Sequence, residues 1–199
     1  MDREEFPGRG EAAVTGGAEI TLERLRRLVR ERSWREGDFT LSSGMKSTFY
    51  IDLKATTLHP EGAALIGALS VRMLRDEGVP VDAVGGLTLG ADPLATATSL
   101  AAREVGLFWP AFIVRKEPKG HGTSRYIEGT ENLPPKARCL VLEDVVTTGA
   151  SSLKAIARLR EAGYQPVAVL TVVDRGEGGR EAIEREGVRF FRLLDLNQI

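Results

Sequence analysis

Cysteine is almost absent from this sequence of 199 residues, which contains only Cys139. A single cysteine cannot form a disulfide within the chain, and this fits a reducing compartment. Cys139 stands in an apolar run, so we expect it to be a small buried hydrophobic side chain. Neither Cys139 nor His59 has partners at metal-ligand spacing, so we expect no metal held directly by protein side chains.

Net charge is also nearly absent, because 27 Lys and Arg oppose 28 Asp and Glu. No overall field attracts nucleic acid or an anionic membrane, so any anion binding must be local. Every apolar run is shorter than the roughly 20 residues that span a bilayer. The opening MDREEFPGRGEAAVTGG lacks the apolar stretch of a secretory signal. We therefore expect a cytoplasmic protein without membrane or nucleic-acid partners, in which residues 1–19 form a disordered leader.

Residues 20–199 are expected to form one domain, since this length is within the range of a single core. Near the N-terminus, helical spacing of apolar residues predicts a helix over 20–34, and FTLSSGMKSTFYID predicts a hairpin around Ser43 and Gly44. Apolar strands and amphipathic helices then alternate, which predicts an α/β fold with a parallel sheet covered on both faces. The strands are expected at 81–84, 111–115, 139–142, 167–173 and near Phe190, and the helices at 60–77, 91–105, 151–162 and 180–186.

The segment RCLVLEDVVTTGASSLKAI joins an apolar strand to a helix through two acids and a hydroxyl-rich turn. Ligands of parallel sheets bind beyond the carboxyl ends of the strands, so Glu143 and Asp144 are expected to face that crevice. Carboxylates suit a sugar diol because they accept hydrogen bonds from neighbouring hydroxyls. Gly149 lets the backbone approach a ligand, and the free N–H groups at the helix start favour a phosphate. The hydroxyl donors here are Thr147, Thr148, Ser151 and Ser152.

Two simpler interpretations stay open at this point: the hydroxyls merely cap the helix, or the acids form a solvated strand end. Neither explains the whole combination of strand, acid pair and turn. LVLEDVVTTGAS resembles the signature of the type I phosphoribosyltransferases, in which the acids hold the ribose hydroxyls and the turn binds the 5′-phosphate. The resemblance assigns the binding of phosphoribosyl diphosphate to Glu143, Asp144, Val145, Val146, Thr147, Thr148, Gly149, Ala150 and Ser151.

A second glycine-rich segment, GGLTLGADPLA, follows the strand at 81–84. It is either a second anion-binding loop or a tight turn that needs positive φ. In the resembled family, backbone groups of this turn contact the diphosphate. Many members carry a lysine just before the last glycine, whereas this chain has Leu89. The glycines do not have the G-x-G-x-x-G spacing of a dinucleotide-binding protein, so we set that alternative aside.

A third segment, FIVRKEPKGHGTSRYIEG, begins a long loop over 117–135 that lacks apolar periodicity. Such a basic loop is ordinarily solvated surface. A mobile basic loop also suits a departing diphosphate, whose charge it can neutralise while it excludes water. The loop resembles the R-K-x-x-K-x-H-G catalytic loop of the orotate phosphoribosyltransferases, which implies that Arg115, Lys116, Lys119 and His121 contact the diphosphate.

A fourth segment, VVDRGEGG, places Arg175 at a strand end on the same rim as Asp144. The plain alternative is a surface pair between Arg175 and Asp174. The family's D-R-x-E-G-G stretch supplies the arginine that contacts orotate, and its turn threonine, here Thr147, shares that role. FTLSSGMKSTFYID resembles the family's N-terminal hood, which maps largely to 20–58. It leaves open whether Ser42 or Lys46 contacts orotate.

Taken together, the resemblance over about 39–179 implies an orotate phosphoribosyltransferase. It implies Mg²⁺ as cofactor, orotate and phosphoribosyl diphosphate as substrates, and a homodimer with shared active sites. Asp144, Lys119 and His121 are the implied catalytic residues, and the last two stabilise or protonate the leaving group. Two rival functions are a purine-base phosphoribosyltransferase and a regulator that senses phosphoribosyl diphosphate without turnover. Arg175 and the loop weigh against the first, and the lack of a basic stripe weighs against the second.

We expect Asp144→Asn to weaken the binding of phosphoribosyl diphosphate by about 1.5 to 3 kcal/mol, the value of a hydrogen bond to a charged group. The reason is that an amide offers a diol fewer acceptors than a carboxylate, while the fold is unaffected. Titration calorimetry measures the affinity. An affinity equal to that of the wild type would remove Asp144 from the ribose site.

Overall fold

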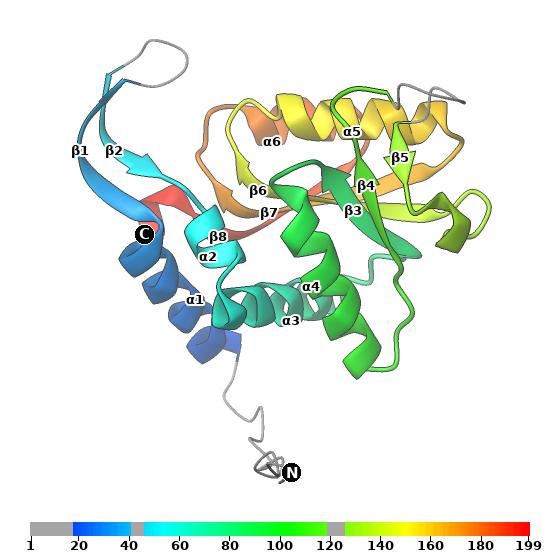
Figure 1. Ribbon diagram of the computed structural model, residues 1–199, viewed down its shortest axis with the longest axis horizontal. Helices are drawn as coiled ribbons and strands as arrows, with labels where there is room; N and C mark the ends of the chain where they lie inside the picture. The colour runs from blue at the N-terminus through cyan, green and yellow to red at the C-terminus, as the bar shows by residue number, and fades with distance from the viewer. Residues whose placement is uncertain (1–17, 41–45, 119–125) are drawn as a thin grey trace, which may run out of the picture.

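The computed structural model describes residues 18–40, 46–118 and 126–199. Its centre is a six-stranded sheet with strand order β5-β4-β3-β6-β7-β8 (Figure 1). Neighbouring strands are parallel except for the antiparallel pair β4 and β5. The bounds are β3 Ala83–Leu87, β4 Ala111–Val114, β5 Ile127–Glu128, β6 Arg138–Val146, β7 Gln165–Asp174 and β8 Arg189–Asp195. This confirms the expected α/β architecture with a mostly parallel sheet.

Helices cover both faces of this sheet, with α5 and α6 on one face and α1, α3 and α4 on the other (Figure 1). Their bounds are α1 Ala18–Arg32, α3 Pro60–Asp76, α4 Ala91–Glu104, α5 Ala150–Glu161 and α6 Gly179–Arg185. Adjacent strand residues belong to different apolar clusters: Val141 packs with Ile156 of α5, whereas Leu142 packs with Leu94 of α4. A strand that is buried on both faces must be apolar at consecutive positions, which is why these strands have no polar alternation.

A smaller antiparallel sheet precedes the large one and consists of β1 (Trp34–Thr40) and β2 (Lys46–Ile51). It confirms a hairpin, although β1 begins at Trp34, where the helix was expected to continue. The Trp34 ring stacks on Phe49 at 4.4 Å between centroids, and this contact favours the extended backbone over another helical turn. The turn at Ser43 and Gly44 lies outside the described residues. A short helix, α2 (Lys54–Thr57), follows β2 and was not predicted.

Two further differences concern the edge of the large sheet where function is expected. Strand β6 continues to Val146, so Glu143 and Asp144 lie within the strand rather than after it. The segment expected as loop over 117–135 contains β5 and a short 3₁₀ helix at Thr130–Asn132. A strand of two residues is too short to produce a periodic pattern, so β5 could not be predicted from periodicity.

Gly86 of β3 leaves no room for a side chain, because a Cβ there would lie 2.2 Å from the Leu142 carbonyl oxygen and 2.7 Å from the Ala91 Cβ. We expect Gly86→Ala to lower the free energy of unfolding by more than about 2 kcal/mol, as overpacking does. Gly78→Ala is the control: Gly78 has φ +61° and open space around it, so it costs only about 1 kcal/mol of backbone strain. Urea unfolding measures both. Equal losses would contradict the close approach of β3 and β6.

Candidate active site

Three turns meet at the carboxyl edge of the sheet, after β3, β6 and β7. The turn after β3 touches β6, because a Cβ on Gly90 would lie 2.7 Å from the Asp144 Oδ1. The turn after β6 touches the start of α6, where a Cβ on Gly179 would lie 2.5 Å from the Thr147 carbonyl oxygen. The structure therefore brings together the acid pair, the hydroxyl-rich turn and the glycine-rich turn.

The turn after β6 ends at Gly149, which has φ +81° and is the N-cap of α5. A glycine has no side chain to cap the helix, and the N-cap makes no side-chain hydrogen bond. Capping therefore does not account for this turn, and the N–H groups at the start of α5 face a hollow of about 60 Å³. Its lining is Glu143, Val145, Val146, Thr147, Gly149, Ala150, Ser151 and Ser152. Thr148 is exposed beside it.

Consecutive positions in β6 place the two acids on opposite faces of the strand. Glu143 is buried on the α5 side, where its Oε2 accepts a hydrogen bond of 3.5 Å from the Ser152 hydroxyl. Asp144 is partly exposed, and its Oδ1 accepts a hydrogen bond of 2.8 Å from the Val145 N–H. Burial, together with the negative charge of Asp144, raises the pKa of Glu143 to about 8. At neutral pH Glu143 therefore carries a proton.

Arg175 follows β7 at the same edge. Its N–H donates to the Val146 carbonyl at 3.0 Å, and its Nε lies 2.8 Å from the Glu177 Oε1. Its side chain is only 17% exposed, and its guanidinium lies 5.8 Å from the ring centroid of Phe49. Arg175 is therefore held between β7 and the two-stranded sheet, facing the other turns of the edge.

Asp174 does not pair with Arg175, which argues against the surface pair considered from the sequence. The Asp174 carboxylate is buried and forms an ion pair of 3.0 Å with Arg192. Its second oxygen accepts the Gly176 N–H at 2.9 Å. Asp174 thus anchors the turn and leaves the Arg175 side chain to point elsewhere.

Phe49 is a site residue that sequence reasoning missed. It stacks on Trp34 at an interplanar angle of 6°. The Arg175 guanidinium also lies over its ring. An aromatic residue in a hairpin strand is ordinarily interpreted as packing, so the pattern alone could not distinguish this role. Lys46, which was considered for the same side of the site, begins β2 and lines a hollow with Asp38, Phe39 and Thr48. Ser42 lies outside the described residues.

The basic segment leaves the sheet after β4. The Arg115 N–H donates to the Tyr126 carbonyl at 2.7 Å, and its guanidinium forms an ion pair of 3.1 Å with Glu128. Lys116 is exposed, and its carbonyl accepts a hydrogen bond of 3.0 Å from the Lys154 ammonium of α5. The two ends of the segment are thus joined to each other and to α5. Lys119 and His121 lie outside the described residues.

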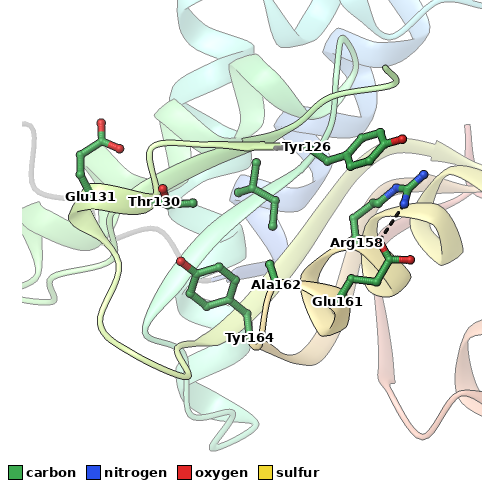
Figure 2. Close-up of a pocket in the computed structure, with 8 residues that line it drawn as sticks. Tyr126, Thr130, Glu131, Arg158, Glu161, Ala162 and Tyr164 are labelled. Carbon is green, nitrogen blue, oxygen red and sulfur yellow. Dashed lines mark hydrogen bonds and ion pairs between the residues drawn. The ribbon is translucent and has the colours of Figure 1, made fainter. Parts of the chain in front are cut away.

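A larger cavity, of about 600 Å³, lies away from this edge, between the C-terminal half of α5 and the segment 126–131. Figure 2 shows Arg158 and Glu161 side by side from α5, with the Tyr126 ring next to the guanidinium. The Arg158 guanidinium lies 3.5 Å from that ring centroid and 2.7 Å from the Glu161 carboxylate. The Arg158 guanidinium is thus already engaged by Tyr126 and Glu161. Among the residues that the structure describes, no glycine- and hydroxyl-rich turn borders this cavity, so the sheet edge remains the candidate site for the substrates.

In the described ranges, no three or more His, Cys, Asp or Glu side chains converge as ligands of a metal ion. None of the helices in this part of the chain has the length and apolar character needed to cross a membrane.

Comparison with known proteins gives one consistent relationship. No protein-family model matches the chain. An orotate phosphoribosyltransferase of Nostoc sp. is 49% identical over 188 residues, which are 93% of this chain and 89% of that protein. The orotate phosphoribosyltransferase of Mycobacterium tuberculosis, crystallised with Fe(III) dicitrate, superposes with a TM-score of 0.79 and 44% identity over 89% of this chain and 98% of that one. Its complex with phosphoribosyl diphosphate gives 0.75 and 41%, over 89% and 98%.

The raised pKa of Glu143 predicts how stability changes with pH. Below pH 4.5 the side chain is protonated in both the folded and the unfolded chain, whereas between 4.5 and about 8 only the unfolded chain ionises. The wild type therefore loses stability across this range, and Glu143→Gln, which stays neutral, does not. We expect the variant to gain on the order of 2 to 4 kcal/mol over the wild type by pH 8, at about 1.4 kcal/mol per pKa unit.

Urea unfolding of both proteins at pH 4.5 and pH 8 measures this difference. Glu131→Gln is the control, because Glu131 is exposed. The difference in the free energy of unfolding between the wild type and Glu131→Gln should be the same at both pH values. A difference between wild type and Glu143→Gln that is the same at both pH values would show that Glu143 ionises normally.

Proposed function

The chain belongs to the orotate phosphoribosyltransferase family, and we propose which of its residues carry out the transfer of ribose 5-phosphate from phosphoribosyl diphosphate to orotate. The reaction gives orotidine 5′-phosphate and diphosphate in pyrimidine biosynthesis. The observation that supports our assignment most is that the α5 phosphate turn, the acid pair and Arg175 meet at one sheet edge.

Phosphoribosyl diphosphate binds with its 5′-phosphate on the free N–H groups at the start of α5. Asp144, which is partly exposed and charged, accepts hydrogen bonds from the ribose hydroxyls, and Glu143 completes the acid pair from the buried side. The residues proposed to bind this substrate are Arg115, Lys116, Lys119, His121, Glu143, Asp144, Val145, Val146, Thr147, Thr148, Gly149, Ala150 and Ser151. The crystallised complex of the M. tuberculosis relative with the same compound supports this substrate.

Orotate binds against Arg175 and Thr147. The Glu177 carboxylate pairs with the Arg175 Nε at 2.8 Å. A guanidinium has paired donors that match the planar carboxylate of orotate. Phe49 closes this side of the site from the two-stranded sheet. We propose on this basis that residues 20–58 form a hood over the base, on a single domain of residues 20–199.

Cleavage of the bond between C1 of the ribose and the diphosphate oxygen gives the ribose oxocarbenium character and leaves negative charge on the diphosphate. Lys119 and His121 of the basic segment are proposed to stabilise that charge, and one of them donates a proton. Asp144 keeps the ribose in place and stabilises its positive charge. No covalent nucleophile is required of the protein.

Mg²⁺ is the proposed cofactor, and the described residues fit it. Mg²⁺ retains water and substrate oxygens as ligands. It would therefore be held by diphosphate oxygens and water at the edge where Asp144 lies, and no direct protein ligand is proposed. When bound, the ion would neutralise part of the diphosphate charge.

A homodimer is proposed as the assembly. Large apolar side chains are exposed on α2, on the turn after β3 and at the end of α4, and they provide a surface for a second copy. They are Leu58, Leu89, Leu100, Val105 and Phe108. We also propose a cytoplasmic location, which the free, buried Cys139 supports.

The function is tested by supplying phosphoribosyl diphosphate, Mg²⁺ and one base at a time. We expect loss of orotate and release of diphosphate, with no turnover of adenine, hypoxanthine or uracil. Turnover of a purine base instead would assign the rival specificity. Binding without turnover of any base would indicate a regulator.

Arg175→Ala is expected to raise the KM for orotate roughly 10- to 100-fold, because a charged hydrogen bond contributes about 1.5 to 3 kcal/mol. The KM for phosphoribosyl diphosphate is expected to stay within about twofold of the wild type, since ribose and phosphate contacts remain. Steady-state kinetics with each substrate varied measures both. Arg180→Ala is the matched control, as Arg180 is exposed on α6 and pairs with Glu184. An unchanged KM for orotate in Arg175→Ala would place the base elsewhere.

A shared active site is tested by mixing two inactive variants, Lys119→Ala and Asp144→Asn, after dissociation and reassociation. If the loop of one subunit serves the site of the other, each hybrid dimer has one site without either change. At equal mixing about half the dimers are hybrids, so activity is expected to return to roughly a quarter of the wild type. Mass spectrometry verifies subunit exchange. Hybrids that form without recovery of activity would mean that each loop serves its own subunit.

A further inference from the structure

Lys54 lies within electrostatic range of Asp144 and has no place in the assignment so far. It begins α2, directly after the turn that follows β2. Its backbone N–H donates to the Asp52 Oδ1 at 3.1 Å, and its ammonium lies 3.3 Å from the same oxygen. Both ends of the residue are therefore fixed by one carboxylate oxygen. The side chain is nonetheless 47% exposed, so its ammonium remains accessible to a ligand.

The charge of Asp144 acts on Lys54 in the folded protein. Burial alone lowers the pKa of Lys54, but the carboxylates of Asp144 and Asp52 outweigh it and raise the pKa. Asp144 itself touches the turn after β3, at Gly90. In Figure 1, α2 stands where β2 reaches the large sheet. Lys54, Asp144 and the turn after β3 thus share one corner of the site.

That turn offers an anion no cationic side chain. It consists of Thr88, Leu89 and Gly90, and the Thr88 hydroxyl is already bonded to the Asp92 carboxylate at 2.7 Å. Leu89 is apolar and 62% exposed. A diphosphate placed against this turn would meet backbone groups on one side and the negative charge of Asp144 on the other. It needs a positive charge at this corner.

We propose that Lys54 binds the diphosphate group of phosphoribosyl diphosphate and supplies the cation that the turn after β3 lacks. The proposal rests on the proposed function, since it takes that compound as the substrate. Before the substrate binds, Asp52 holds the ammonium in position, and the charge of Asp144 attracts it. A lysine ammonium is a compact point charge on a flexible stem, so it can turn from a carboxylate to a phosphate oxygen without movement of the backbone.

The test compares Lys54→Met, Lys54→Arg and Lys136→Met. Lys136 is exposed just before β6, at the opposite end of that strand from Asp144, so its variant removes the same charge without touching the site. Titration calorimetry with Mg²⁺ present measures the affinity for diphosphate and, separately, for ribose 5-phosphate. Kinetics measures the KM for each substrate, and urea unfolding verifies that each variant is folded. Lys54→Gln serves as a second charge-removing variant if Lys54→Met is unstable.

Lys54→Met is expected to bind diphosphate roughly tenfold more weakly and to raise the KM for phosphoribosyl diphosphate by a similar factor, as loss of one charged contact does. Affinity for ribose 5-phosphate and the KM for orotate should stay within about twofold, and Lys54→Arg should recover most of the loss. Wild-type affinity for diphosphate in Lys54→Met would overturn the proposal, as would a loss confined to ribose 5-phosphate. If the wild type fails to convert orotate, the proposed function is wrong, whereas the diphosphate titration still decides the role of Lys54.

Discussion

Two carboxylates at adjacent positions of one buried strand are the constraint on which the rest of this site depends. Strand β6 is covered on both faces, so Glu143 must lie on the α5 side and Asp144 on the other. A low-dielectric position next to an existing negative charge disfavours a second charge, and the pKa of Glu143 rises accordingly. Glu143 is therefore neutral at pH 7, and only Asp144 is within reach of solvent.

The surrounding elements follow from that division. On the neutral side, Ser152 of α5 donates to Glu143, and the start of the same helix faces the phosphate hollow. On the charged side, Gly90 permits the turn after β3 to touch Asp144, where any side chain would collide. Lys54, at the start of α2, balances the charge of Asp144. In the proposed assignment, this strand separates the site for the 5′-phosphate from the site for the diphosphate, with the ribose between them.

Much of this arrangement was predictable because its parts are contiguous in sequence. The run from Glu143 to Ser151 is strand, turn and helix in one piece, so composition alone indicated both its fold and its chemistry. The position of Arg175 at this edge was predictable from its place at a strand end, whereas its role towards orotate came from the resemblance to the family. Phe49 and Lys54 were not predictable, because their proposed roles depend on Arg175 and Asp144, which are distant from them in sequence. The extension of β6 to Val146 was missed for a related reason: two acids and a threonine turn are typical of a strand end, and pairing with β7 keeps them in the sheet.

The unequal acid pair can be observed directly by NMR. Protein labelled with ¹³C at the glutamate side-chain carboxyl carbon is titrated without substrate, and the Glu143 resonance is identified as the one missing from Glu143→Gln. We expect its inflection near pH 8. An inflection near the ordinary value of 4.5 would show that both acids are charged at neutral pH and would contradict the account.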